Sequence, residues 1–181
     1  MRDRILALIP LKDGHVIPSN CVRSYIIQTV KIDIICVSRP SERSSFDIDD
    51  IECSHNTEHA ITTNYNLLRE EALKTDEDMF LLLHRDVCFK NTDDVSSLIN
   101  FLETNPEYGA VAHNTRDTKV HAGRSDLIHI DVACMLIRKY VLEKVPFGNR
   151  YGCNCQTLGE AMKLLPFFKK SKYLDKRILF S

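Results

Sequence analysis

The chain has 181 residues, of which 44% are hydrophobic, and its formal net charge at pH 7 is -1. This length and composition predict one domain with a substantial apolar core. The near-neutral charge excludes the large cationic surface on which non-specific binding to nucleic acid or to an anionic membrane depends. No apolar stretch is long enough to cross a membrane, and the run after Arg4 is too short for a signal peptide, so we expect a cytoplasmic protein.

The segments of the first half alternate between strand-like and helix-like patterns. Apolar runs with β-branched residues predict buried strands, and polar capping residues before mixed segments predict helices. Ser19 or Asn20 is the expected N-cap of the first helix. The expected order is a strand over Arg4–Pro10, a helix from Pro18 to about Thr29, a strand over Ile32–Val37, a short strand over Ile51–Ser54 and a helix from Glu58 or Thr62 to Lys74.

The second half continues the alternation. Its expected order is a central strand over Met79–Leu83, a helix capped at Thr92–Asp94 and ended by Asn105–Pro106, a strand over Gly109–His113, a mobile loop over Thr115–Arg124, a strand over Ile128–Ile137, a helix over Arg138–Lys144 and a last helix over Leu158–Leu165. Alternating strands and helices predict a mostly parallel sheet covered on both faces. One domain would occupy residues 1–165, with a basic tail over residues 166–181.

The seven cysteines are an odd and rather high number. Cys36, Cys88 and Cys134 lie in apolar, strand-like segments, where we expect buried thiols. No C-x-x-C pair occurs, and Cys153-Asn154-Cys155 is too tightly spaced for the usual zinc site. We therefore expect a reduced protein; the sequence does not exclude a disulfide, but nothing in it supports one.

The most apolar run, Met79–Leu83, is followed at once by His84-Arg85-Asp86-Val87. A buried strand that ends on His and Asp brings both side chains to the sheet edge at which α/β proteins hold ligands and metals. With Asn91, this tetrapeptide also fits the H-R-D-x-x-x-x-N pattern of the protein-kinase catalytic loop. A kinase is disfavoured because no glycine-rich loop precedes the pattern and no Asp-Phe-Gly follows it.

Further short segments keep a common order over most of the chain. They are Leu8-Ile9-Pro10, Ser24–Thr29, Ile34–Ser38, Asn66 with Ala72, Phe80–Val87, Pro106–Val111, Asp131–Arg138 and Leu142–Phe147. Together they resemble the nucleotide-sugar-binding domain of the family 2 glycosyltransferases. This resemblance implies the GT-A fold of nucleotide-diphospho-sugar transferases, a Rossmann-like α/β sandwich with a mostly parallel central sheet and helices on both faces, over residues 1–165.

The resemblance also implies a site for a nucleotide-diphosphate sugar at the carboxyl ends of the strands. The nucleotide would lie near Pro10 and Leu11 after the first strand, near Ser38 and Arg39 after the second, and near Asn66. Ser38 stands where the family has the Asp that holds the base.

The family's D-x-D motif has here the form His84-Arg85-Asp86. A diphosphate requires a cation, and Mn²⁺ or Mg²⁺ prefers hard oxygen ligands. Asp86 is the expected metal ligand, although a strand-end Asp can also be a plain turn cap. His84 could bind the metal, donate a hydrogen bond to the sugar or cap the strand, and Arg85 could bind the diphosphate directly. With only one carboxylate, we expect weak or absent metal binding.

An inverting transferase needs a general base beside the acceptor hydroxyl, which the family supplies as an Asp. The corresponding stretch here, residues 147–156, has no acid, and Asn154 stands about where the Asp is expected. Asp131, Glu160 and Asp126 are the nearby substitutes. Nucleotide binding is therefore better founded than catalysis.

We thus expect a glycosyltransferase that moves a sugar from a nucleotide-diphosphate sugar to an acceptor hydroxyl with inversion. The alternative is a catalytically degenerate nucleotide-sugar-binding or interaction module, and a third class is a plain structural α/β domain that binds no nucleotide. The sequence identifies no acceptor, and it is compatible with a homo-oligomer. The basic tail could contact an anionic acceptor or the edge of a membrane.

Overall fold

A computed structural model of the chain describes residues 2–12, 15–39, 54–114, 133–144, 146–147, 172–177 and 179–180. The helices are α1 (Ser19–Ile26), α2 (Ser54–Leu73), α3 (Asp94–Thr104) and α4 (Lys139–Lys144). The strands are β1 (Arg4–Lys12), β2 (Lys31–Arg39), β3 (Met79–Leu83), β4 (Val87–Cys88), β5 (Ala110–Asn114), β6 (Cys134–Arg138), β7 (Lys172–Arg177) and β8 (Leu179–Phe180). None of the described helices is long and apolar enough to span a membrane.

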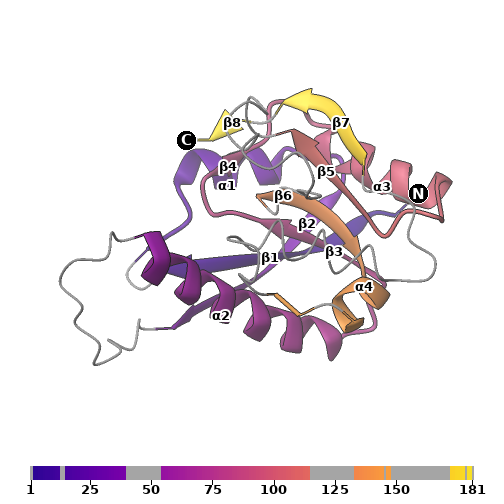
Figure 1. The fold of residues 1–181 in the computed structure, drawn as a ribbon. Helices are drawn as coiled ribbons and strands as arrows, with labels where there is room; N and C mark the ends of the chain where they lie inside the picture. Colours follow the sequence, from indigo (N-terminus) through magenta and orange to yellow (C-terminus); the bar gives the residue numbers. More distant parts are fainter. Residues whose placement is uncertain are drawn as a thin grey trace.

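The central sheet has six strands in the order β2-β1-β3-β6-β5-β7 (Figure 1). β1 pairs in parallel with β2 and β3, and β5 pairs in parallel with β7. β6 is antiparallel to both of its neighbours, β3 and β5. The mostly parallel sheet expected from the sequence is therefore confirmed, and the carboxyl ends of β1, β2 and β3 meet at one edge of it.

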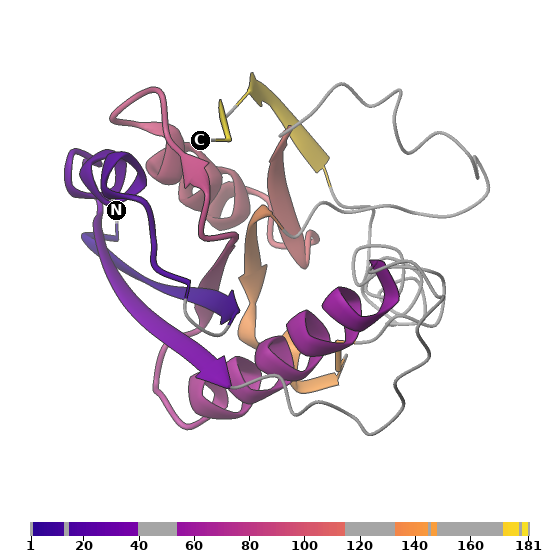
Figure 2. The same ribbon diagram turned by 90° about the vertical axis from the view of Figure 1, so that its left-hand side faces the viewer.

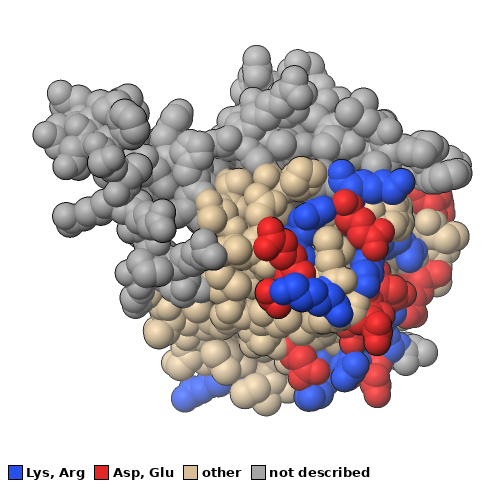
Figure 3. Space-filling view, turned by 90° about the horizontal axis from the view of Figure 1, so that it is seen from below, with Lys and Arg blue, Asp and Glu red and all other residues tan. Residues whose placement is uncertain are grey.

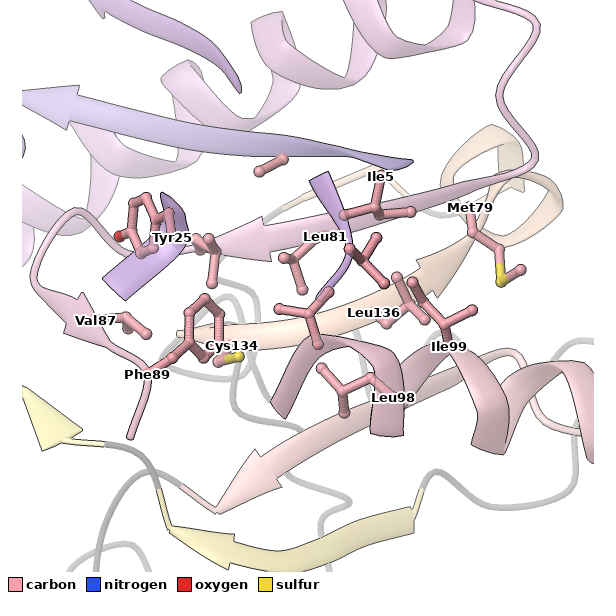
Figure 4. Packing of buried hydrophobic residues seen from close by; sticks show 14 of the residues in the cluster. Ile5, Tyr25, Met79, Leu81, Val87, Phe89, Leu98, Ile99, Cys134 and Leu136 are labelled. Atoms are coloured by element: carbon pink, nitrogen blue, oxygen red, sulfur yellow. The ribbon is translucent and has the colours of Figure 1, made fainter. Parts of the chain in front are cut away.

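The sheet separates two hydrophobic layers, with α2 on one side and α1 and α3 on the other (Figure 2). In β3 the side chains alternate between these layers: Met79, Leu81 and Leu83 pack with α1 and α3, whereas Phe80 and Leu82 pack with α2 and α4. Figure 4 shows Leu81 and Leu136 of the sheet facing Leu98 and Ile99 of α3. All of β3 is buried because both of its faces are covered.

Helix boundaries differ from the sequence prediction where tertiary contacts decide them. Pro18, and not Ser19 or Asn20, is the N-cap of α1, and its carbonyl accepts the first helical bond from Val22 N at 3.1 Å. The helix ends at Ile26, before the expected Thr29. The side chain of Gln28 is bonded instead to the 91–95 segment, with Nε2 2.8 Å from Asn91 O and Oε1 3.2 Å from Val95 N.

The predicted short strand over Ile51–Ser54 is wrong at its last residue, because Ser54 begins α2. Residues 51–53 lie outside the described residues. The long strand expected from Ile128 begins only at Cys134, because Ala133 is in a turn, and residues 128–132 are again outside the described part. The mobile loop over Thr115–Arg124 and the last helix over Leu158–Leu165 also lie outside it.

The expected basic tail contains two strands that the sequence did not predict. β7 adds to the sheet beside β5, and β8 pairs antiparallel with β4 just after the His84–Asp86 turn. A second correction concerns Cys36, which is exposed on the edge strand β2 and not buried; Cys134 is buried as expected, and Cys88 is half-buried.

Charged side chains of both signs intermingle on the described surface shown in Figure 3. The Glu77 carboxylate, just before β3, forms ion pairs with Arg4 at 2.9 Å and with Arg2 at 3.5 Å, and Arg2 also pairs with Asp78. These pairs lie near the amino ends of β1 and β3, opposite the predicted site, and pairs of this partly exposed kind contribute little to stability.

Candidate functional site

The predicted site begins with a tight turn at the end of β3. His84 N donates to Ala133 O at 2.9 Å, which continues the pairing of β3 with β6. Val87 N then donates to His84 O at 3.2 Å, the closing bond of a β-turn. Arg85 and Asp86 therefore occupy the two central positions of the turn. Both are half-buried at the carboxyl edge of the sheet.

Among the described residues, the Asp86 carboxylate has no hydrogen-bond or ion-pair partner. Its negative charge contributes to the raised pKa of Tyr25. Burial is the largest cause of that shift, the nearby thiols come next and Asp86 is the smallest. A turn-capping aspartate accepts backbone N–H groups, and no described residue supplies one here. The described part of the chain thus leaves the Asp86 carboxylate available to a ligand.

Arg85 turns toward the segment between β1 and α1. Its Nη1 atom donates to Val16 O at 3.1 Å, and this is the only hydrogen bond of the guanidinium within the described residues. A guanidinium carries five N–H donors. Several donors of Arg85 therefore have no hydrogen-bond partner in the described part of the structure.

His84 belongs to a group of rings on the α2 side of the sheet. The fully buried ring of Tyr65 stacks on Phe147, with ring centroids 4.7 Å apart and planes 19° apart. The same ring lies 6.4 Å from the imidazole of His84, at an interplanar angle of 35°. Tyr65 thus connects the end of β3 with the segment that follows α4.

Asparagines on either side of Tyr65 bind backbone groups of distant segments. Asn66 Nδ2 donates to Phe147 O at 3.1 Å, and Phe147 N donates to Asn66 Oδ1 at 3.0 Å. Asn64 Nδ2 donates to Leu11 O, at the end of β1, at 2.8 Å. The Asn66 amide is therefore paired with a peptide group, and the expected contact between Asn66 and a nucleotide stays a prediction.

Asn64 is a site residue that the sequence reasoning missed. Its side chain is only 4% exposed, and its Oδ1 atom has no hydrogen-bond partner among the described residues. A buried carbonyl without a donor is unfavourable unless a ligand, a water or another group completes it. The only signal in the sequence is the pair of amides flanking an aromatic residue in Asn64-Tyr65-Asn66.

The other predicted nucleotide contacts lie side by side at the same edge. Pro10 pairs with Val37, and Leu11 pairs with Ser38, in the parallel register of β1 and β2. Arg39 is the last residue of β2. Hence the ends of β1, β2 and β3 bring most of the predicted donor residues to one edge. The predicted bases Asp131 and Glu160, and also Asp126, lie outside the described residues.

The described residues contain no group of three or more His, Cys, Asp or Glu side chains that could hold a metal ion. Asp86 and His84 stay the predicted ligands. One carboxylate fits a hard divalent cation if the diphosphate and water supply the other oxygens, as is usual for Mg²⁺ in phosphate sites.

No protein-family model matches the chain, and no curated protein does so either. Among solved structures, protein A197 from STIV is similar, with a TM-score of 0.60 and 14% identity over 96% of this chain and 82% of its own. A mannosyltransferase, PcManGT from Pyrobaculum calidifontis in complex with GDP-Man and Mn²⁺, gives a TM-score of 0.64 and 13% identity over 99% of this chain and 57% of its own.

Glucosyl-3-phosphoglycerate synthase from Mycobacterium tuberculosis, in complex with Mg²⁺ and uridine-diphosphate, gives a TM-score of 0.59 and 11% identity over 98% of this chain and 70% of its own. These likenesses establish the fold: the chain has the mixed α/β architecture of the GT-A glycosyltransferases. The fold class expected from the sequence is thereby confirmed.

Proposed function

We propose that the chain binds a nucleotide-diphosphate sugar at the carboxyl edge of β1, β2 and β3 and transfers the sugar to an acceptor hydroxyl with inversion. The observation that carries the proposal is the Asp86 carboxylate, which has no partner among the described residues and lies in one turn with Arg85. The fold supports it, because solved structures of this fold are complexes with GDP-Man and Mn²⁺ or with uridine-diphosphate and Mg²⁺.

Different residues would bind the nucleoside and the diphosphate of the donor. The nucleoside would lie along Pro10, Leu11, Ser38 and Arg39, at the ends of the paired strands β1 and β2. Arg85 would bind the diphosphate through its remaining donors, since guanidinium matches phosphate oxygens in a two-pronged geometry. The orphaned Oδ1 atom of Asn64 offers an acceptor at the same edge, next to Leu11.

Asp86, with His84 beside it, would hold Mn²⁺ or Mg²⁺. Such a cation neutralises charge on the departing diphosphate. We propose that the chain is a member of the family 2 glycosyltransferases in which His84-Arg85-Asp86 replaces the D-x-D motif. Asp131 and Glu160 stay the proposed general bases, and we propose a cytoplasmic location. The acceptor hydroxyl would attack in line with the departing diphosphate, whose charge Arg85 stabilises directly.

Titration calorimetry with UDP-glucose and with GDP-mannose, each with and without Mn²⁺, tests the binding step. We expect Mn²⁺-dependent binding that weakens by about tenfold or more in Asp86→Asn, because a charge-assisted contact is lost. Asp76→Asn is the matched control, since Asp76 is an exposed carboxylate outside the site. Binding of neither donor, or equal weakening by both variants, would overturn the proposal.

A second candidate function is a nucleotide-sugar-binding module without turnover. The acid-free stretch over residues 147–156 favours it. Release of nucleoside diphosphate from the bound donor separates the two candidates: an enzyme hydrolyses the donor slowly even without acceptor, and Asp86→Asn abolishes that release. Tight binding with no release would indicate the binding module.

A further inference from the structure

The thiols of Cys21 and Cys88 meet between α1 and β4. Their sulfur atoms are 2.8 Å apart, although the residues are 67 positions apart in the chain. A covalent S–S bond is about 2.05 Å long, so the two sulfurs are in close contact without being bonded. Cys21 is fully buried and Cys88 is half-buried. The chain fold thus brings a half-buried cysteine against a fully buried one.

Contacts that involve neither sulfur hold these two segments together. Ser24 Oγ donates to Cys21 O at 2.7 Å and accepts Phe89 N at 3.0 Å. One turn further along, Gln28 bridges to Asn91. The rings of Tyr25 and Phe89 pack edge to face, with centroids 5.7 Å apart (Figure 4 shows both rings). Residues that follow each cysteine therefore already hold the two backbones close together.

We propose that Cys21 and Cys88 are a modification site that forms an intramolecular disulfide. The bond would connect α1 to β4, the strand that follows the turn of Arg85 and Asp86, and so restrain the predicted donor site. Because the fold has already positioned both sulfurs, closure requires little rearrangement, and this preorganisation favours the link over competing ones.

The oxidant is a small-molecule disulfide such as oxidised glutathione. The sulfur of Cys88, the more accessible of the two, attacks one sulfur of the small disulfide and displaces one small thiol, which leaves a mixed disulfide on Cys88. The sulfur of Cys21 then attacks the Cys88 sulfur and displaces the second small thiol. The protein loses two S–H bonds and gains one S–S bond, and the small disulfide is reduced to two thiols that carry the protons.

Mass spectrometry of the full chain tests this link without any donor. After exposure to oxidised glutathione, remaining thiols are alkylated under denaturing conditions and the chain is cut with trypsin without reduction. Cleavage after Lys12, Arg23, Arg85 and Lys90 releases peptides 13–23 and 86–90, each with a single cysteine. We expect these two peptides to be joined. Alkylation of both cysteines, a stable glutathione adduct on Cys88, or a link from either to Cys134 would overturn the proposal.

The thermal midpoint gives an independent readout. A disulfide that closes a loop of this length is expected to raise it by about 5–10 °C, and dithiothreitol should reverse the increase. Cys88→Ala should abolish the redox-dependent increase, whereas Cys36→Ala, at an exposed cysteine on β2, should retain it. An unchanged midpoint in oxidised wild type, or the same increase in Cys88→Ala, would contradict the link. The peptide mapping uses wild-type chain, so it decides even if a variant fails to fold.

Discussion

Asp86 and Asp94 begin from similar positions and have opposite roles. Both follow the central strand, and both lie near a backbone that turns sharply. Asp94, at the start of α3, is 1% exposed, and its Oδ2 atom accepts the N–H groups of Lys90 and Asn91, each at 3.0 Å. Asp86 is half-buried and accepts nothing within the described residues. The fold uses the Asp94 carboxylate to complete its own backbone, whereas none of the described residues binds the Asp86 carboxylate.

A structural acid differs from a candidate ligand in the hydrogen-bond donors that already surround its carboxylate. Position in the sequence does not distinguish the two roles, because turn residues near a strand end are common in both. The number of donors already directed at the carboxylate distinguishes them. Asp94 Oδ1 also accepts Asn91 Nδ2 at 3.0 Å, so both of its oxygens accept local donors. Substitutions with graded effects on stability test this contrast between Asp94 and Asp86.

The largest loss is expected for Asp94→Ala. The N–H groups of Lys90 and Asn91 would lose a charged acceptor that is itself almost fully buried, which should lower the free energy of unfolding by about 3 kcal/mol. Urea denaturation at pH 7 measures it. A loss below about 0.5 kcal/mol would mean that the bonds to Asp94 do not matter to the fold.

Asn66→Ala should cost about 2 kcal/mol, because it removes both hydrogen bonds to the Phe147 peptide. Asn100→Ala, at an exposed position of α3, is the matched control and should change stability by less than about 0.5 kcal/mol. Equal effects in the two variants would show that the amide of Asn66 is not structural, and would favour its predicted contact with a nucleotide.

Tyr25→Phe is expected to be neutral or to stabilise by up to about 1 kcal/mol. The Tyr25 hydroxyl is buried and has no hydrogen-bond partner among the described residues. Burial also raises its pKa above the usual 10.0. A raised pKa contributes stability that is present below the pKa of the unfolded tyrosine and is lost as pH rises further. Unfolding curves from pH 8 to 11 should therefore fall less steeply in the variant above about pH 10; parallel curves would exclude this account.

The smallest change in stability is expected for Asp86→Ala, within about 0.5 kcal/mol of wild type in the same urea experiment. This substitution removes no hydrogen bond and no ion pair within the described residues. A loss as large as that of Asp94→Ala would show that both carboxylates serve the fold, and the contrast between them would disappear.

Local sequence was sufficient to predict the structure of a segment where that structure depends mainly on the segment's own residues. Met79–Leu83 is a strand with the predicted bounds, because an apolar run of this kind is buried on both faces in a covered sheet. The location of His84 to Asp86 at the carboxyl edge followed from that strand. Contacts between distant segments decided the rest. The early end of α1 depends on the hydrogen bond from Gln28 Nε2 to Asn91 O, and no local pattern in the sequence predicts that partner.

The same reason explains why the supporting residues of the site were missed. Asn64 and Tyr65 become site residues only when α2 lies across the end of β1 and against Phe147. Neither partner is near α2 in the sequence. The strands in the basic tail are a similar case, because β7 and β8 are defined by their pairing with β5 and β4.

The hydrogen bonds of the asparagines that flank Tyr65 have a consequence for folding order. Asn64 is 53 positions from Leu11, and Asn66 is 81 positions from Phe147. Contacts this distant form late, because long loops must close first. A chain that is still emerging from the ribosome therefore cannot form the bonds between Asn66 and Phe147, beside the predicted donor site, until the segment after α4 has been synthesised. In the finished protein, hydrogen exchange at the Phe147 amide would report how often the bond from Phe147 N to Asn66 Oδ1 opens.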